Sequence, residues 1–220
     1  MTCRICLSVM VDGSENVDQL MVLLSQKKPD LVEFRLDNLT NLEAIEDIAH
    51  KKTFPVIAAD KSIRDSATTE KRLMAAATSG FEFIDLDLAS PNVRSVIRQV
   101  KSMGSEVIVS FHDFSRTPSR NELGDVLDSQ IKVGSDICKV VTTALYPRDN
   151  LSILRFLEEK SSETRLVSFA MGRNGIVSRI LSPLFGAEFT FASLTEASKT
   201  ADGQLTIDNL RSAWQLLGVQ

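Results

Sequence analysis

Short runs of apolar, β-forming residues alternate along the chain with segments whose apolar positions recur every three or four residues. The runs begin about every 20 to 30 residues, which is the spacing of repeated strand–helix units. They predict strands over residues 4–9, 31–37, 54–59, 81–88, 106–111, 136–142, 165–171 and 188–194. Helical periodicity is clear between them over residues 16–25, 42–50, 69–78, 91–103, 150–160 and 206–217, the last beginning with an N-cap at Thr206 and ending at Gly218.

This alternation of strands and helices indicates parallel strands joined by right-handed crossovers. Eight such units within 220 residues fit a closed (β/α)8 TIM barrel better than an open doubly wound sheet. No G-x-G-x-x-G sequence follows the first strand, which counts against a dinucleotide-binding fold. The chain also lacks a low-complexity or Pro-rich linker, so residues 1–220 are predicted to form one compact α/β domain.

Composition and charge narrow the partners that the chain is expected to have. The net charge is −4 and the basic residues are scattered, so the overall field opposes binding to nucleic acid and to anionic membranes. Neither a signal peptide nor a stretch of membrane-spanning length stands out, and we therefore expect a cytoplasmic protein without a membrane partner. Any anionic ligand should be a small molecule held by a few arginines.

The three cysteines do not form a disulfide framework, since an odd number cannot all pair. Cys3 and Cys6 have the C-x-x-C spacing of redox and zinc motifs. Both fall within the first predicted strand, however, where this spacing turns them to opposite faces. We therefore interpret them as packing residues.

Three charged residues interrupt the second predicted strand. Val32, Phe34 and Leu36 form one apolar face suited to the outer helices. Glu33, Arg35 and Asp37 alternate with them and should point into the barrel together, which is costly unless the charges are paired or functional. The alternative is an amphipathic edge strand with one wet face, which would suit an antiparallel sheet.

A lysine, Lys139, lies in the middle of the sixth predicted strand. We expect it to point up the barrel interior, where desolvation and a nearby guanidinium would lower its pKa. A neutral amine is the form that Schiff-base formation requires. The alternative is a structural ion pair with Glu33 or Asp87, and this strand alone does not decide between the two.

The fifth predicted strand runs directly into His112, one of two histidines in the chain. Active sites of (β/α)8 barrels gather at the C-terminal ends of the strands. Because consecutive strands are neighbours, His112 and Lys139 could act on one small molecule, with the imidazole as general acid and base. An inert histidine at the barrel rim is the alternative.

Two later loops add candidate binding residues. Glycines at 172 and 175 allow a tight turn close to a ligand, and Arg179 beyond them offers a planar fork that matches a carboxylate. The loop over residues 195–204 is long and polar, and it is either a lid or a mobile connector.

Together these residues resemble the type I 3-dehydroquinate dehydratase family along essentially the whole chain. The resemblance rests on the E-x-R-x-D, S-x-H-D-F and M-G-x-x-G-x-x-S-R elements, which begin at Glu33, Ser110 and Met171, and on the single strand lysine between the last two. Each element is weak alone, but their order and spacing are specific. The resemblance implies a (β/α)8 fold, no metal or organic cofactor, and dehydration of 3-dehydroquinate to 3-dehydroshikimate in the shikimate pathway.

The resemblance also implies a role for each matching residue. Lys139 would form the imine with the substrate ketone, and His112 would move the proton between carbon and the departing hydroxyl. Glu33 and Arg35 would hold the ring hydroxyls, and Arg179 the carboxylate. The remaining substrate-binding positions are Ser8, Arg64, Thr200 and Gln204.

The chain departs from the family pattern in two loops. Thr68 stands where the family has a glutamate four residues after the Arg64 position, and the S-A-P-G-Q of the last loop reads T-A-D-G-Q from Thr200 to Gln204. These departures bear on the lid and on affinity more than on the reaction. A Schiff-base aldolase and a non-catalytic binding module on the same fold stay as alternatives, and a homodimer is the default assembly.

Overall fold

The computed structural model describes residues 3–62 and 66–219. In chain order the elements are β1 (Ile5–Met10), α1 (Val17–Lys27), β2 (Leu31–Arg35), α2 (Glu43–Lys51), β3 (Val56–Ala59), α3 (Ser66–Thr78), β4 (Phe83–Asp87), α4 (Val93–Ser102), β5 (Glu106–His112), α5 (Arg120–Val133), β6 (Ile137–Thr143), α6 (Asp149–Lys160), β7 (Leu166–Met171), the 3-10 helix η1 (Arg173–Gly175), α7 (Ile176–Leu181), the 3-10 helix η2 (Ser182–Phe185), β8 (Thr190–Ser193), β9 (Leu205–Thr206) and α8 (Ile207–Leu216).

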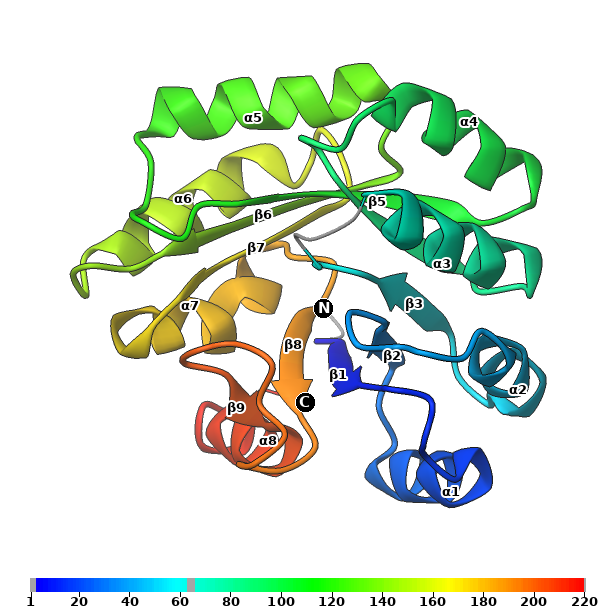
Figure 1. Cartoon of the computed structure of the whole chain (residues 1–220). Helices are drawn as coiled ribbons and strands as arrows, with labels where there is room; N and C mark the ends of the chain where they lie inside the picture. The colour runs from blue at the N-terminus through cyan, green and yellow to red at the C-terminus, as the bar shows by residue number, and fades with distance from the viewer. Residues whose placement is uncertain (1–2, 63–65, 220) are drawn as a thin grey trace.

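The strands form one parallel sheet that curls into a barrel. Their order is β7-β6-β5-β4-β3-β2-β1-β8-β9, so each crossover helix joins neighbouring strands, and the helices surround the strands in Figure 1. The amide of Glu188, just before β8, donates to the carbonyl of Leu166 on β7 at 2.8 Å, which links the two sides of the ring. The predicted (β/α)8 fold is therefore confirmed.

The structure adds detail that the periodicity did not predict. Helix α5 was not among the predicted helices, although Ser119 and Glu122 form a capping box at its start and Gly134 ends it in the left-handed region. The short strand β9 extends the sheet beyond the eight predicted strands. The N-cap expected for the last helix is present, because the Thr206 hydroxyl accepts from the amide of Asn209.

Alternate residues of each strand face the helices or the barrel interior. On β2, Val32 and Phe34 belong to the large core between sheet and helices, whereas Leu31 belongs to a separate apolar cluster inside the barrel. That interior cluster also contains Ile108 of β5 and Ile137 of β6. Two residues further along these strands, the interior positions are polar and are occupied by Glu33, Ser110 and Lys139. The candidate site residues therefore lie above an apolar floor.

The cysteines agree with their interpretation as packing residues. All three cysteines are free, with Cys6 buried on β1 and Cys3 half-buried just before the strand. Cys3 therefore lies outside the strand in which it was expected.

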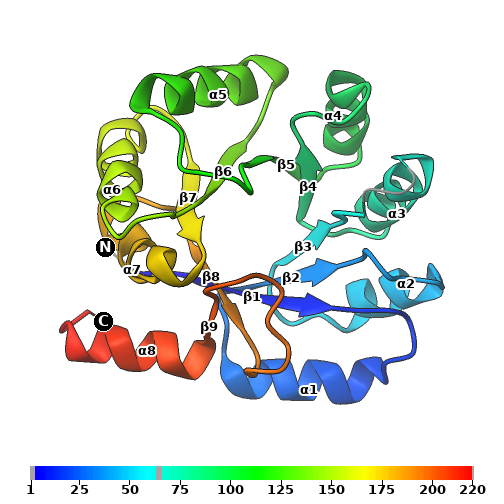
Figure 2. The same ribbon diagram turned by 60° about the vertical axis from the view of Figure 1, so that its left-hand side comes forward.

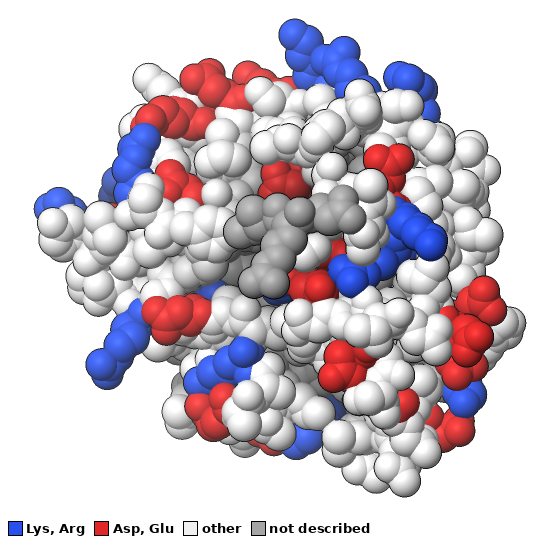
Figure 3. All heavy atoms as spheres, viewed as in Figure 1, with Lys and Arg blue, Asp and Glu red and all other residues white. Residues whose placement is uncertain are grey.

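Acidic and basic side chains are interspersed on the face shown in Figure 3. Among residues 3–62 and 66–219 no helix is long and apolar enough to cross a bilayer.

Candidate active site

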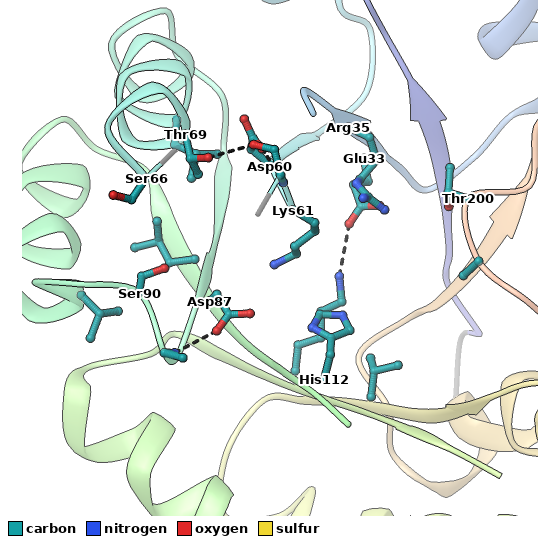
Figure 4. Close-up of a pocket in the computed structure, with 18 of the residues that line it drawn as sticks. Glu33, Arg35, Asp60, Lys61, Ser66, Thr69, Asp87, Ser90, His112 and Thr200 are labelled. Carbon is teal, nitrogen blue, oxygen red and sulfur yellow. Dashed lines mark hydrogen bonds and ion pairs between the residues drawn. The ribbon is translucent and has the colours of Figure 1, made fainter. Parts of the chain in front are cut away.

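A cavity of about 650 Å³ opens at the C-terminal ends of the strands. It receives side chains from β2, β5, β6, α7 and the loop after β8, and Figure 4 shows Glu33, Arg35, Lys61 and His112 around it. Seven of the residues proposed from the sequence line this one cavity: Glu33, Arg35, His112, Lys139, Arg179, Thr200 and Gln204.

Lys139 points into the barrel from the middle of β6, as expected. The side chain is almost completely buried, and its Nζ donates to Asp85 Oδ2 at 2.8 Å and to Glu33 Oε2 at 3.2 Å. The Nζ also lies 4.3 Å from the ring centroid of Phe191. The predicted partner Glu33 is therefore present, but the second carboxylate is Asp85 rather than Asp87.

The expected lowering of the Lys139 pKa is wrong. Burial by itself lowers this pKa, but the attraction of the Asp85 and Glu33 carboxylates outweighs it and raises the pKa above its ordinary value. The resting amine is therefore an ammonium ion. Since an iminium ion carries the same charge at the same atom, the two carboxylates would stabilise it in the same way.

The sequence analysis did not identify two charged residues at the site: Lys61, which lines the cavity, and Asp85, which is buried behind its wall. Asp85 is completely buried on β4 and accepts from Lys139, from Lys61 Nζ at 2.7 Å and from Ser110 Oγ at 2.6 Å. Burial alone would raise the pKa of its carboxyl group, but the two ammonium groups hold that pKa far below its usual range. The sequence feature that could have identified Asp85 was its interior position on the fourth predicted strand.

His112 ends β5 at the rim of the cavity. Its ring stacks on Phe114, with the centroids 5.8 Å apart and the planes inclined by 12°. Burial lowers the pKa of His112 well below its ordinary value, and the positive charges of Lys61 and Lys139 lower it further. The imidazole is therefore neutral at neutral pH, which is the form that can accept a proton.

Arg179, on α7, is buried and approaches the cavity beside an aromatic ring. Its guanidinium carbon lies 4.4 Å from the ring centroid of Phe169, and Nη2 donates to the carbonyl of Asp202 at 3.2 Å. The Nε has no hydrogen-bond partner among residues 3–62 and 66–219. Burial lowers the pKa of Arg179 to about 10. A buried cation with an unused donor is suited to receive an anionic group of a ligand.

The loop over residues 195–204 is docked onto the strand ends in this structure. Thr200 Oγ1 donates to Ser8 Oγ at 3.1 Å, and Ser8 in turn donates to Glu33 Oε1 at 2.6 Å. The Thr200 amide donates to Gln204 Oε1 at 2.8 Å. Figure 2 shows this loop projecting beside β1. Ser8 is buried just behind the cavity wall, so it reaches the cavity through Glu33 and Thr200.

The remaining predicted positions are distributed as follows. Arg35 lines the cavity, but its guanidinium binds Asp37 through two hydrogen bonds of 2.9 and 2.6 Å. Arg64 lies outside the described residues. Thr68 falls in the first turn of α3. After β3, Lys61 lines the cavity and binds Asp85.

Comparison with known proteins identifies a matching family and several related chains. The family profile described as type I 3-dehydroquinase matches residues 5–220. A 3-dehydroquinate dehydratase of Pyrococcus abyssi is 31% identical over 213 residues, covering 93% of this chain and 95% of that relative. One from Dehalococcoides mccartyi is 37% identical over 145 residues, and the match spans 64% of this chain and 64% of the relative's own length. The crystal structure of 3-dehydroquinate dehydratase from Geobacillus kaustophilus is similar with a TM-score of 0.87 at 25% identity, covering 99% of this chain and 91% of that one.

Proposed function

This chain belongs to the type I 3-dehydroquinase family, and on that premise we propose that it dehydrates 3-dehydroquinate to 3-dehydroshikimate through a Schiff base on Lys139. The reaction is a carbon–oxygen lyase step of the shikimate pathway. The observation that carries the proposal is the meeting of Lys139 and His112 in one cavity above the apolar floor of the barrel.

The chemistry begins with transfer of the extra proton from the Lys139 ammonium ion to the neutral imidazole of His112. The neutral amine adds to the C3 ketone, and the carbinolamine hydroxyl then takes this proton from His112 and leaves as water, so that an iminium ion and a neutral imidazole remain. Glu33 and Asp85, which bind the resting ammonium at 3.2 and 2.8 Å, are placed to bind this cation as well. Their negative charge offsets the cost of keeping a positive charge in a buried site.

Elimination follows because the iminium acidifies the neighbouring carbon. His112 takes the proton from C2, and the electron pair of that bond forms an enamine. The enamine pushes out the C1 hydroxyl, to which His112 returns its proton, so that water leaves and the iminium is restored. Hydrolysis of the iminium by water then releases 3-dehydroshikimate and returns Lys139 to its resting ammonium form.

The rest of the cavity is suited to the polar groups of this substrate. Arg179 offers its unused donor to the carboxylate, with Thr200 and Gln204 of the docked loop beside it. Glu33 and Arg35 present an acceptor and donors to the ring hydroxyls. These assignments follow from the matching positions of the family and from the shared cavity.

Borohydride trapping tests the proposal directly. Incubation with 3-dehydroquinate and borohydride should reduce the imine and add mass to the peptide that contains Lys139. The Lys139→Met variant should show no adduct and no dehydration, whereas Lys160→Met should behave as wild type, because Lys160 pairs with Glu163 on the helical exterior. An unmodified Lys139 in the active wild-type protein would refute the Schiff base. Cleavage of a sugar phosphate without dehydration of 3-dehydroquinate would instead support the aldolase alternative.

A further inference from the structure

Lys61 lies in the catalytic cavity but has no part in the chemistry described above. It follows the end of β3 by two residues, and its side chain is 18% exposed. The Nζ donates to Asp85 Oδ1 and to Ser110 Oγ, each at 2.7 Å. Both contacts are directed inward, toward the strands that carry His112 and Lys139. A lysine that only increased solubility would extend its ammonium group into water instead.

The contact with Asp85 divides one carboxylate between two lysines. Asp85 Oδ1 accepts from Lys61 and from Ser110, and Oδ2 accepts from Lys139. The carboxylate side chain has no exposed surface, so water does not screen these contacts. Lys61 therefore takes up a share of the negative charge that would otherwise act on Lys139 alone.

The same ammonium lies on the side of β5 that carries His112, the proposed proton carrier, because it donates to Ser110, two residues earlier on the same face of that strand, and the side chains of Lys61 and His112 both line the cavity. Among the residues that the structure describes, the cations Lys61, Lys139 and Arg35 oppose protonation of this imidazole, Lys61 most strongly, and the carboxylate of Asp85 favours it. Glu33, Asp87 and Arg179 also line the cavity, and Glu33 is bound to Lys139 and Ser8.

We propose that Lys61 is a positioning residue of the proposed dehydration, whose ammonium group shares Asp85 with Lys139 and holds a positive charge on the side of β5 that carries His112. The proposal rests on the proposed function, since it concerns the same catalytic pair. A purely structural role for Lys61 would be to neutralise a buried carboxylate. The two roles differ in one respect: the positioning role requires the charge itself and predicts a change in the pH profile.

The test compares the pH profiles of two Lys61 variants and one control variant. Lys61→Gln keeps a donor for Asp85 and Ser110 but removes the charge, whereas Lys61→Arg keeps the charge. Loss of a neighbouring cation should raise the pKa of His112, so the acid limb of kcat/KM in Lys61→Gln should move upward by about one pH unit, a loss of about tenfold on that limb. Lys61→Arg should keep the wild-type profile.

The matched control is Lys52→Gln. Lys52 is 17% exposed, binds the carboxylate of Glu82 and donates to the carbonyl of Gly80 at 2.6 Å, so the substitution removes the same charge from a lysine that is about as exposed as Lys61. Lys52 precedes β3, at the opposite end of the strands from the cavity. Its substitution should leave the acid limb of kcat/KM where it is in wild type.

A second readout does not depend on activity. The chain has two histidines, so the imidazole signal of His112 can be followed by NMR against that of the exposed His50 on α2. Lys61→Gln, or Lys61→Met if the glutamine variant does not fold, should move the His112 titration upward and leave the His50 signal unchanged. An unmoved His112 titration overturns the proposal, and so does an equal shift in Lys61→Arg. Borohydride trapping on Lys139 in each variant tests the Schiff base separately, so that failure of the Lys61 proposal can be distinguished from failure of the Schiff-base proposal.

Discussion

The protonation states of single residues in this barrel depend on neighbours on other strands. Lys139 is bound by Glu33 from β2 and Asp85 from β4, and these carboxylates reverse the effect that burial has on its pKa. His112 has the opposite surroundings, since cations outnumber carboxylates around its ring. The resulting pair is an ammonium beside a neutral imidazole, which is the combination expected for an amine that must lose a proton and a base that must accept one.

Substitution of His112 separates proton transfer from imine formation. In His112→Ala, kcat should fall by roughly 10²–10⁴, the usual contribution of one general base. Borohydride with 3-dehydroquinate should still label Lys139, more slowly than in wild type. His50→Ala is the control, because His50 is exposed on α2. A variant with wild-type kcat would contradict the role assigned to His112.

Arg179 should contribute to binding more than to the chemical step. Arg179→Lys keeps a cation but loses the planar fork and the free Nε, so KM for 3-dehydroquinate should rise about ten- to hundredfold while kcat changes less. Steady-state kinetics measure both constants. Arg173→Lys, an exposed position in the same loop, should leave both unchanged. A fall in kcat with constant KM would argue against a carboxylate contact.

At the scale of elements, the two loops that follow β7 and β8 are joined through their backbones. The Gly172 amide donates to the carbonyl of Asp202 at 3.2 Å. Gly203 has φ +72°, and a Cβ there would lie 2.4 Å from the carbonyl oxygen of Gly172. This close approach holds the loop that carries Thr200 and Gln204 against the cavity. The loop is therefore docked in this structure, and its role as a lid stays a prediction.

Gly203→Ala tests whether the docking matters for binding. The added methyl group cannot fit against the Gly172 carbonyl, so the loop should detach, KM should rise, and limited proteolysis should cut within residues 195–204. Gly80→Ala provides the control, because Gly80 also has positive φ but no atom lies within 4 Å of the added Cβ. Equal protease resistance of Gly203→Ala and wild type would show that the docking tolerates a side chain.

At the scale of the whole molecule, the buried titratable groups make stability depend on pH. The pKa of His112 is lower in the folded state than its ordinary 6.5, so the unfolded chain binds a proton first as the pH falls. The Asp85 pKa is depressed below 3.8, and its contribution is present above that value and lost as the pH falls through the folded pKa. The Lys139 pKa is raised, so its contribution is complete below 10.5 and lost only at higher pH.

These signs predict a two-stage loss of stability in acid. The free energy of unfolding, measured with urea, should begin to fall as the pH drops below about 7 because of His112, and should fall more steeply below about pH 4 because of Asp85. His112→Gln should flatten the first stage and leave the second. A first stage of equal size in that variant would show that other groups cause it.

The homodimer expected for a chain of this size stays a prediction, and analytical ultracentrifugation measures it. Exposed apolar side chains near the cavity, including Phe114, Leu145 and Tyr146, are the surfaces to examine if a dimer forms.

The sequence by itself determined the architecture and the main catalytic candidates. Period-two apolar runs separated by helical segments permit few arrangements other than parallel strands with crossover helices, and the barrel followed. Once the strands are parallel, alternation places Lys139 inside and the end of β5 places His112 at the rim. Both inferences depend on local pattern, which a single sequence contains.

The tertiary structure decided how the charges pair. Lys61 and Asp85 are 24 residues apart, and Lys139 and Asp85 are 54 apart, so their contacts exist only through the register of β3, β4, β5 and β6. The sign of the Lys139 pKa shift depended on those contacts, because burial lowers the pKa and two carboxylates raise it. The hydrophobic pattern specifies which face a side chain occupies, whereas electrostatic interactions depend on distances between strands, which only the folded chain sets.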